Sequence, residues 1–283
     1  MSRQYHYLVA GFPDLFFDDS KVSVNLNEFR SLLEENLPED DVNIIRLHFY
    51  RYDNQNILIK LQDKGDSYDQ RGNLSEADIE ALFNAVKEGS DSAYFLGIPS
   101  YLGKFVEAFK ADIPLFEGKS WELQLSELYY DYVTSKSNVF VRNWFLFERD
   151  MQNILTAGQC RKYNMSVEKQ LIGQSEIVEK LSRSNARDFG LDNEFPFVEA
   201  ILKTIEEDDL REYEKKIDRI KWDYLDDAVF FHFFTIEKLF SFVVRLSIIE
   251  RWLSLDKETG KELLNELLNN LEASYEFPEE FKL

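Results

Sequence analysis

The sequence predicts an all-α fold, and three observations support that prediction. Glycine and proline are sparse, 11 and 6 among 283 residues, which favours long helices over many short strands joined by turns. Apolar residues recur at helical spacing through most of the chain, and no convincing pair of alternating strands is visible. Hydrophobic residues make up 44% of the chain, enough to form a sizeable core.

The first expected helices follow an aromatic N-terminal segment. Residues 5–17 are aromatic and apolar, and this pattern is compatible with either a minor strand or a first helical turn. A helix is expected to begin near Asn25, because Glu28 stands three residues later as a capping-box partner. Pro38 is expected to end this helix, and the next helix is expected over residues 40–62.

Cap residues and breakers divide the next part of the chain. Residues 63–73 are polar and contain two glycines, so they are expected to form a loop. Ser75 is expected to cap a helix, with Asp78 at the third helical position. Further breaks are expected at residues 97–99 and 114–118, where proline and glycine lie close together.

The second half of the chain is expected to be helical with few interruptions. One helical stretch is predicted over 120–160, with a break near 135–138. Ser166 suggests another helix start, and residues 196–275 are expected to be helical from a proline at the first position. A turn is expected within that last stretch, near 256–260.

The charge balance excludes several classes of partner. The formal net charge is −20, so the chain is expected to repel nucleic-acid phosphates and anionic membrane surfaces. No apolar run approaches the ~18 residues that a membrane span needs, and residues 1–15 do not resemble a signal peptide. Cys160 is the single cysteine, which is typical of a reducing cytoplasm. The sequence therefore predicts a cytoplasmic protein without direct bilayer insertion.

A short internal repeat singles out four polar residues. The hexapeptide Asp-Asn-Gln-Asn-Ile-Leu at 53–58 recurs 97 residues later as Asp-Met-Gln-Asn-Ile-Leu at 150–155. Aspartate and asparagine three positions apart share one face of a helix, and half-buried polar groups need partners. These residues are therefore predicted to be structural anchors that fix helix register: Asp53, Asn56, Asp150 and Asn153.

The offset also predicts how the chain is divided. One third of the length is about 94 residues, close to the offset of 97. A third copy would then fall in the last third, where residues 239–246 are helical and aromatic but lack the Asp-x-x-Asn pair. The prediction is a single all-helical body built of pseudo-symmetric units near 1–97, 98–187 and 188–283.

Three segments carry a resemblance to a known family. Residues 5–15 (Tyr-His-Tyr-Leu-Val-Ala-Gly-Phe-Pro-Asp-Leu), the two Asp-x-x-Asn-Ile-Leu motifs and residues 248–256 resemble an uncharacterised bacterial family encoded beside V-type ATPase subunits. That family in turn is similar to the C-type rotor component of V/A-type ATPases, called the d component in eukaryotes. This C-type component is built from helical repeats in which an acidic residue followed by Asn-Leu recurs on a helix.

The resemblance implies a shape and a function. It implies a funnel-like helical cup that sits on the proteolipid ring and receives the central shaft subunits. Such a protein has no active site, metal or cofactor, and it couples rotation between a soluble ATPase head and an ion-translocating ring. It would lie on the cytoplasmic face of the inner membrane, held there by its protein partners.

An enzymatic alternative rests on clustered aspartates. Asp223, Asp226 and Asp227 lie close together in a predicted helix, and such clusters bind magnesium and diphosphate in helical prenyl-transfer enzymes. Those sites need a second acidic cluster, but residues 206–209 are better explained as a helix start, where carboxylates favour the dipole. No phosphate-binding loop and no histidine pair at metal-ligand spacing occurs. The alternative is a magnesium-dependent enzyme acting on diphosphates.

Overall fold

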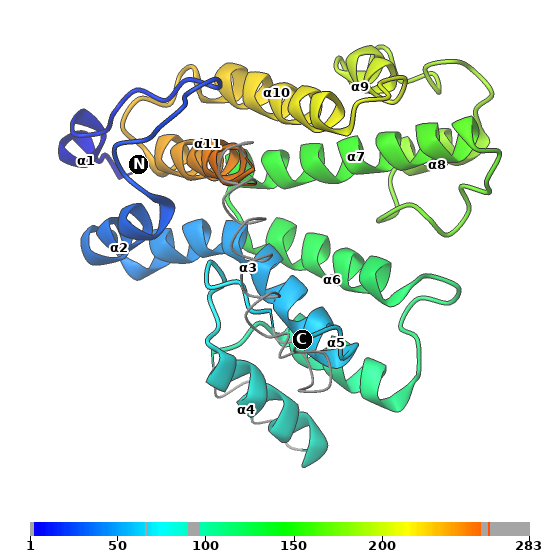
Figure 1. Cartoon of the computed structure of the whole chain (residues 1–283), viewed down its shortest axis with the longest axis horizontal. Coiled ribbons are helices and arrows are strands. Elements are labelled where there is room, and N and C mark those ends of the chain that lie inside the picture. The colour runs from blue at the N-terminus through cyan, green and yellow to red at the C-terminus, as the bar shows by residue number, and fades with distance from the viewer. Residues whose placement is uncertain (1–2, 66, 90–96, 256–259, 261–283) are drawn as a thin grey trace, which may run out of the picture.

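A computed structural model describes residues 3–65, 67–89, 97–255 and 260 (Figure 1). Within these residues the chain forms eleven helices and no strand, which confirms the all-α prediction. The helices are α1 (His6–Ala10), α2 (Leu26–Asn36), α3 (Glu39–Leu61), α4 (Glu76–Lys87), α5 (Ser100–Ala111), α6 (Trp121–Lys136), α7 (Val139–Lys162), α8 (Glu176–Arg183), α9 (Val198–Thr204), α10 (Leu210–Val229) and α11 (Ile236–Ser254).

The helix starts predicted from the caps Asn25 and Ser75 are confirmed. The Asn25 side chain accepts a hydrogen bond from the backbone N–H of Glu28 at 2.9 Å, as an N-cap does. Ser75 and Asp78 form a complete capping box at the start of α4. At the N-terminus the helical alternative holds and the strand does not, because residues 6–10 form α1.

Three predicted boundaries in the second half are wrong. The helix expected from Ser166 begins only at Glu176, because Ser175 is the capping residue there. Pro196 lies two residues before α9 rather than at its first position. The helix expected over 196–275 is broken after Thr204 and again after Val229. The turn expected near 256–260 and the helix beyond it lie outside the described residues, apart from Gly260.

The helices pack in layers around buried aromatic side chains. In Figure 1, α7 and α11 cross the middle of the molecule, α9 and α10 lie on one side, and α2, α3 and α6 lie on the other. Phe145 of α7 contacts Phe240 of α11 and Tyr129 of α6, with ring centroids 5.9 and 6.0 Å apart. These rings are buried, and interlocked aromatic packing of this kind makes a protein interior stiff.

Three long helices begin at similar intervals along the chain. The helices α3, α7 and α11 start at Glu39, Val139 and Ile236, and α11 packs against both of the others. A short connection precedes each of them, after α2, α6 and α10 respectively. The long helices thus bring residues from widely separated parts of the sequence together in the middle of the fold.

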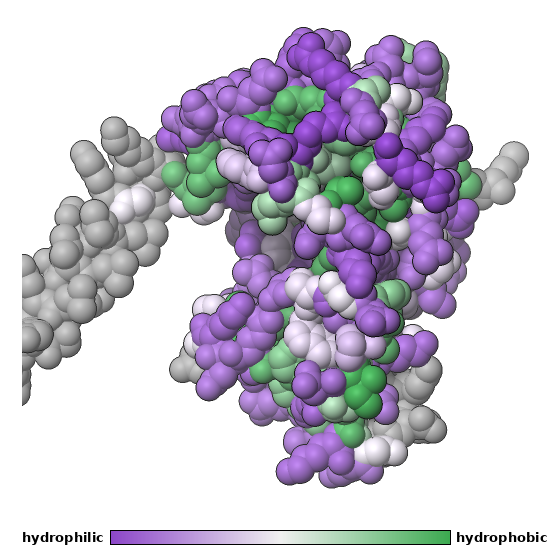
Figure 2. Space-filling model, turned by 90° about the vertical axis from the view of Figure 1, so that its right-hand side faces the viewer, coloured by the Kyte–Doolittle hydropathy of each residue, from purple (hydrophilic) through white to green (hydrophobic). Residues whose placement is uncertain are grey.

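Polar residues dominate one face of the molecule. Figure 2 shows a face on which hydrophilic residues cover most of the surface and hydrophobic residues form separate patches. Among the described helices, none is long and apolar enough to cross a membrane.

Candidate functional site

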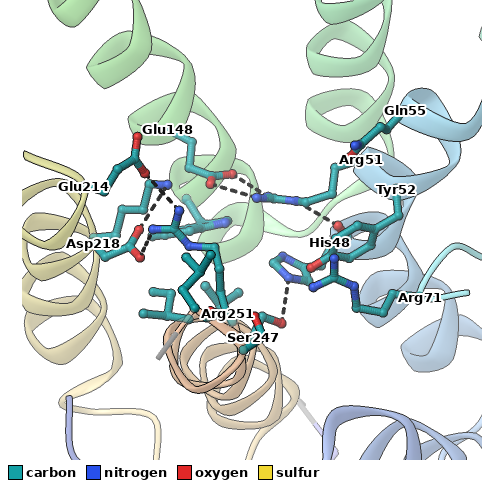
Figure 3. Close-up of a pocket in the computed structure, with 16 residues that line it drawn as sticks. His48, Arg51, Tyr52, Gln55, Arg71, Glu148, Glu214, Asp218, Ser247 and Arg251 are labelled. Carbon is teal, nitrogen blue, oxygen red and sulfur yellow. Dashed lines mark hydrogen bonds and ion pairs between the residues drawn. The ribbon is translucent and has the colours of Figure 1, made fainter. Parts of the chain in front are cut away.

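A charged hollow lies between α3, α7, α10 and α11 (Figure 3). We call it the central cleft; its volume is about 460 Å³. Its walls carry four basic residues, Arg51, Arg71, Lys221 and Arg251, and three acidic ones, Glu148, Glu214 and Asp218. In a chain with 53 acidic and 33 basic residues, this local balance is unusual. The cleft lining is therefore slightly cationic within a strongly acidic molecule, although its cations pair with nearby carboxylates.

A fork-shaped ion pair joins α3 to α7 across the cleft. The Arg51 Nη2 and Nη1 atoms lie 2.8 and 3.3 Å from the two carboxylate oxygens of Glu148. Arg51 Nε also donates to the carbonyl oxygen of His48 at 3.0 Å, so the guanidinium has a fixed orientation. A two-pronged contact of this type is stronger and more directional than a contact to a single oxygen.

A second ionic network joins α10 to α11. Arg251 donates to Glu214 at 2.9 Å and also to Asp218. Asp218 is almost fully buried, and it accepts a further hydrogen bond from the Trp252 indole at 2.9 Å. Lys221 lies 3.7 Å from the other oxygen of Asp218. A buried carboxylate needs such partners, because an unpaired buried charge is very costly.

Two buried polar atoms in the cleft walls lack a hydrogen-bond partner within the described structure, His48 Nδ1 and Trp144 Nε1. His48 Nε2 lies 3.1 Å from Ser247 Oγ, and that hydroxyl donates to the carbonyl of Val243 at 2.8 Å. Ser247 therefore accepts from Nε2–H, which leaves Nδ1 as the bare nitrogen of a neutral ring. Burial lowers the pKa of His48, and the nearby charge of Arg51 lowers it further, so this ring stays neutral at physiological pH.

The two predicted asparagines make the same contacts at the two copies of the repeat. Asn56 donates through Nδ2 to the carbonyl of Asp69 at 2.9 Å and accepts from the backbone N–H of Asp69 at 2.8 Å. Asn153 forms the same pair of bonds with Ile172, at 2.8 and 2.7 Å. Each amide thus satisfies both backbone groups of one residue in the following loop; we call this arrangement the asparagine clamp.

The two predicted aspartates make different contacts. Asp53 is fully buried and accepts from the backbone N–H groups of Asn73 and Leu74, both at 2.9 Å. Asp150 instead pairs with the neighbouring Arg149, whose Nε and Nη2 lie 2.9 and 2.8 Å from one carboxylate oxygen. Asp53 and Asn56 both lie in α3 and bind the loop that follows this helix. In the second pair, only Asn153 binds the loop that follows its helix.

The repeat also lies beside residues that sequence reasoning missed. None of the four predicted anchors lines the central cleft. Arg51 and Glu148 do line the cleft. Each stands two residues before the aspartate of its repeat copy, so the two residues are 97 positions apart. The ion pair therefore joins equivalent positions of the two copies. Two oppositely charged residues separated by the same 97 positions as the repeat were the signal in the sequence that could have revealed this pair.

A carboxylate occupies the corresponding position in the last third. Moving 97 residues on from Asn153 leads to Glu250, and the Glu250 side chain accepts from the backbone N–H of Leu26 at the start of α2. This contact ties α11 to a segment from the beginning of the chain. Glu250, at the third position, thus also accepts a hydrogen bond from a backbone N–H group, but its partner Leu26 lies at the start of α2.

With this geometry in hand, comparison with known proteins identifies a family. The model of a family described as "Protein of unknown function (DUF2764)" matches residues 1–275. The chain belongs to this family. No curated protein and no solved structure matches the chain. The family match covers every described helix, the central cleft and both asparagine clamps.

The aspartates of the enzymatic alternative do not converge. Asp223, Asp226 and Asp227 lie in the last turns of α10 and are exposed, and Asp226 pairs with Arg245. The second acidic cluster, residues 206–209, precedes the first turn of the same helix, roughly 20 Å away at 1.5 Å per residue. Asp209 caps that helix by accepting from the backbone of Arg211 and Glu212. Across the described residues, no three His, Cys, Asp or Glu side chains are grouped to hold a metal.

Proposed function

We propose that this protein is a non-catalytic coupling subunit in the rotor of a V/A-type ATPase. It would link the shaft subunits to the proteolipid ring on the cytoplasmic face of the inner membrane. The observation that supports this proposal most is the recurrence of the asparagine clamp at Asn56 and Asn153. A helical repeat with asparagine at one fixed position is the feature that the resemblance to the C-type rotor component implies.

The central cleft is the candidate receiving site for a shaft subunit. Four long helices frame it, and their ionic contacts, Arg51 with Glu148 and Arg251 with Asp218, tie the walls together. A protein that transmits torque must resist deformation, and ion pairs such as the two-pronged contact of Arg51 with Glu148 add directional contacts between helices to the apolar packing.

Charge complementarity is expected to orient the partners. The net charge of −20 suits basic patches on the shaft or on the loops of the ring, whereas the cations of the cleft suit acidic groups on the inserted element. Binding is therefore expected to weaken with added salt, because exposed charges are screened over about 10 Å at 0.1 M ionic strength.

Affinity purification from native membranes tests the proposal. The tagged protein is purified after gentle solubilisation, and the co-purifying proteins are identified by mass spectrometry. The proposal predicts shaft and proteolipid subunits in the eluate, with about one copy of this chain per complex. A tagged Gln55→Glu variant, changed at an exposed position of the cleft, should recover less of these partners, whereas Arg183→Glu, an exposed residue of α8, should retain them. Recovery of the tagged chain alone, while the ATPase assembles without it, would contradict the proposal.

The magnesium-dependent diphosphate enzyme is the weaker candidate. Its aspartates lie on one exposed helix end, and its second acidic cluster lies at the other end of α10. This candidate predicts that diphosphate raises the thermal stability of the protein only when magnesium is present. The Asp226→Asn variant should lose this stabilisation. If such stabilisation is measured, this candidate replaces the coupling role.

A further inference from the structure

A second, smaller hollow lies apart from the central cleft. Its volume is about 200 Å³, and it is enclosed by residues 9–15 and by one face of α11. We call it the N-terminal pocket. Its walls combine polar and apolar side chains, with Val9, Phe12, Leu15 and Phe242 among the apolar ones. A water molecule takes up about 30 Å³ of liquid, so the pocket has room for a small organic group and not for a folded segment.

Three residues of α11 that carry hydrogen-bond donors line this pocket. Lys238, Ser241 and Arg245 line the pocket, and their spacing of three and four residues places them on one face of the helix. Ser241 is 1% exposed, yet its hydroxyl has no hydrogen-bond partner in the described structure. The Arg245 Nε atom is likewise buried and without a partner there. Leaving such a donor unsatisfied costs about 1–3 kcal/mol.

The pocket lining carries two cations, Lys238 and Arg245, and one carboxylate, Asp14. Arg245 has one carboxylate partner, Asp226, which is itself largely exposed. Lys238 has no ion pair with any described residue. Burial lowers the pKa of Lys238 and the charge of Arg245 lowers it further, while Asp226 and Asp14 oppose that effect. Burial also lowers the pKa of Arg245. Arg245 is largely buried and Lys238 is half-buried, and two such neighbouring cations are stabilised when an anion binds between them.

We propose that the N-terminal pocket binds a carboxylate carried on a short apolar group. Lys238, Ser241 and Arg245 would donate to its oxygens, and the side chains of Phe12 and Phe242 would cover its apolar part. A carboxylate can accept three such bonds, and the residues that line the pocket include two cations, Lys238 and Arg245, against one carboxylate, Asp14. The proposal is independent of the coupling role.

The same chemistry can come from a free carboxylic acid or from the carboxyl terminus of a polypeptide. Titration calorimetry on the full chain separates the two sources. Hexanoate represents the free acid and hexan-1-ol is its neutral control; N-acetyl-leucine represents a terminus and its amide is the neutral control. Saturable binding of at least one acid is expected, with no binding of either neutral control. The acid that binds more tightly identifies the source.

Variants assign the binding to this pocket. Lys238→Met should weaken acid binding by about tenfold or more, because a charged donor is lost. Ser241→Ala should weaken it several-fold, and this small truncation guards against misfolding of the lysine variant. Lys203→Met, which removes an exposed lysine of α9, should leave the affinity unchanged. Absence of saturable binding, equal affinity in Ser241→Ala and wild type, or tighter binding of inorganic phosphate than of both acids would overturn the proposal.

Discussion

Asn56 and Asn153 each satisfy the N–H and the C=O of one loop residue with a single side chain. A primary amide can do this because it carries a donor and an acceptor side by side. The repeat in the sequence identified both asparagines and their need for partners. It could not identify Asp69 and Ile172 as those partners, since a backbone group has no residue-type signature and the spacings, 13 and 19 residues, differ.

Replacing Asn153 by leucine is expected to destabilise the protein strongly. The change leaves the buried N–H and C=O of Ile172 without partners, which costs about 2–4 kcal/mol in the free energy of unfolding. Urea unfolding at neutral pH measures the loss. Gln152→Leu, at the exposed neighbouring position, is the matched control and should change stability by less than about 0.5 kcal/mol. Equal losses in the two variants would show that the clamp contributes nothing specific.

Asp53 is expected to make stability depend on pH. Burial raises the pKa of Asp53 to about 6, although hydrogen bonds from Leu74 and Asn73 oppose the shift. The unfolded value is about 3.9, so the folded state binds the proton more tightly and stability falls as pH rises from about 4 to about 6. Asp53→Asn removes this dependence.

The test is the stability of wild type relative to Asp53→Asn at several pH values. Between pH 4 and pH 7 the wild type should lose about 2 kcal/mol relative to the variant. Urea unfolding at each pH measures the difference. A difference that stays constant over this range would mean that the carboxylate is already ionised at pH 4 in the folded protein.

At the scale of helices, the elements set by local signals were predictable and those set by distant contacts were not. The caps at Ser75 and Ser120 follow from a few adjacent residues, and both predicted starts hold. The loop before α8 is different, because Lys119 donates to the carbonyl of Leu171 and Asn153 binds Ile172. Those contacts follow a turn at residues 168–170, where Ser166 suggested a helix, and no local pattern contains them.

The contact between α7 and α9 depends on a glycine. A Cβ atom at Gly158 would lie 2.2 Å from Ile205 Cδ1 and 3.3 Å from Leu202 Cδ2. Alanine normally favours a helix interior over glycine by about 1 kcal/mol, but here the close approach opposes that gain. The glycine therefore lets the two helices pack more closely than any other residue would.

Gly158→Ala is expected to destabilise the protein by about 1–2 kcal/mol despite its higher helix propensity. Ile205→Val removes the Cδ1 atom that the new methyl group would meet, so the double variant should be more stable than Gly158→Ala alone. Thermal unfolding of the four proteins in a double-mutant cycle measures the coupling. Additive effects, with no coupling between the two sites, would rule out this explanation of the glycine.

On the scale of the whole molecule, charged contacts join distant parts of the chain. Arg51 pairs with Glu148, Asn138 donates to Glu237 and Glu250 accepts from Leu26. The composition predicted a helical fold and an acidic surface, and both follow from the printed sequence. It did not predict the central cleft, because that site exists only where α3, α7, α10 and α11 come together.

A charge exchange tests whether the cleft contact holds α3 and α7 together. Arg51→Glu places a carboxylate against Glu148 and should cost about 3 kcal/mol or more. Adding Glu148→Arg should restore a substantial part of that loss. The exposed pair of Arg183 and Glu179 is the matched control, and Arg183→Glu should cost less than about 1 kcal/mol. If the exchange recovers nothing, the pair does not stabilise the contact between the two helices.

The measurement that tests the coupling role most directly is photo-crosslinking from inside the cleft. A benzophenone side chain replaces Gln55, which is exposed and lines the central cleft, and irradiation follows in native membranes. The same group at Arg183, on exposed α8, is the control. The coupling role predicts a crosslink from position 55 to a shaft subunit of the V/A-type ATPase and none from position 183. Crosslinks to proteins outside the ATPase, with the assembled ATPase lacking this chain, would contradict it.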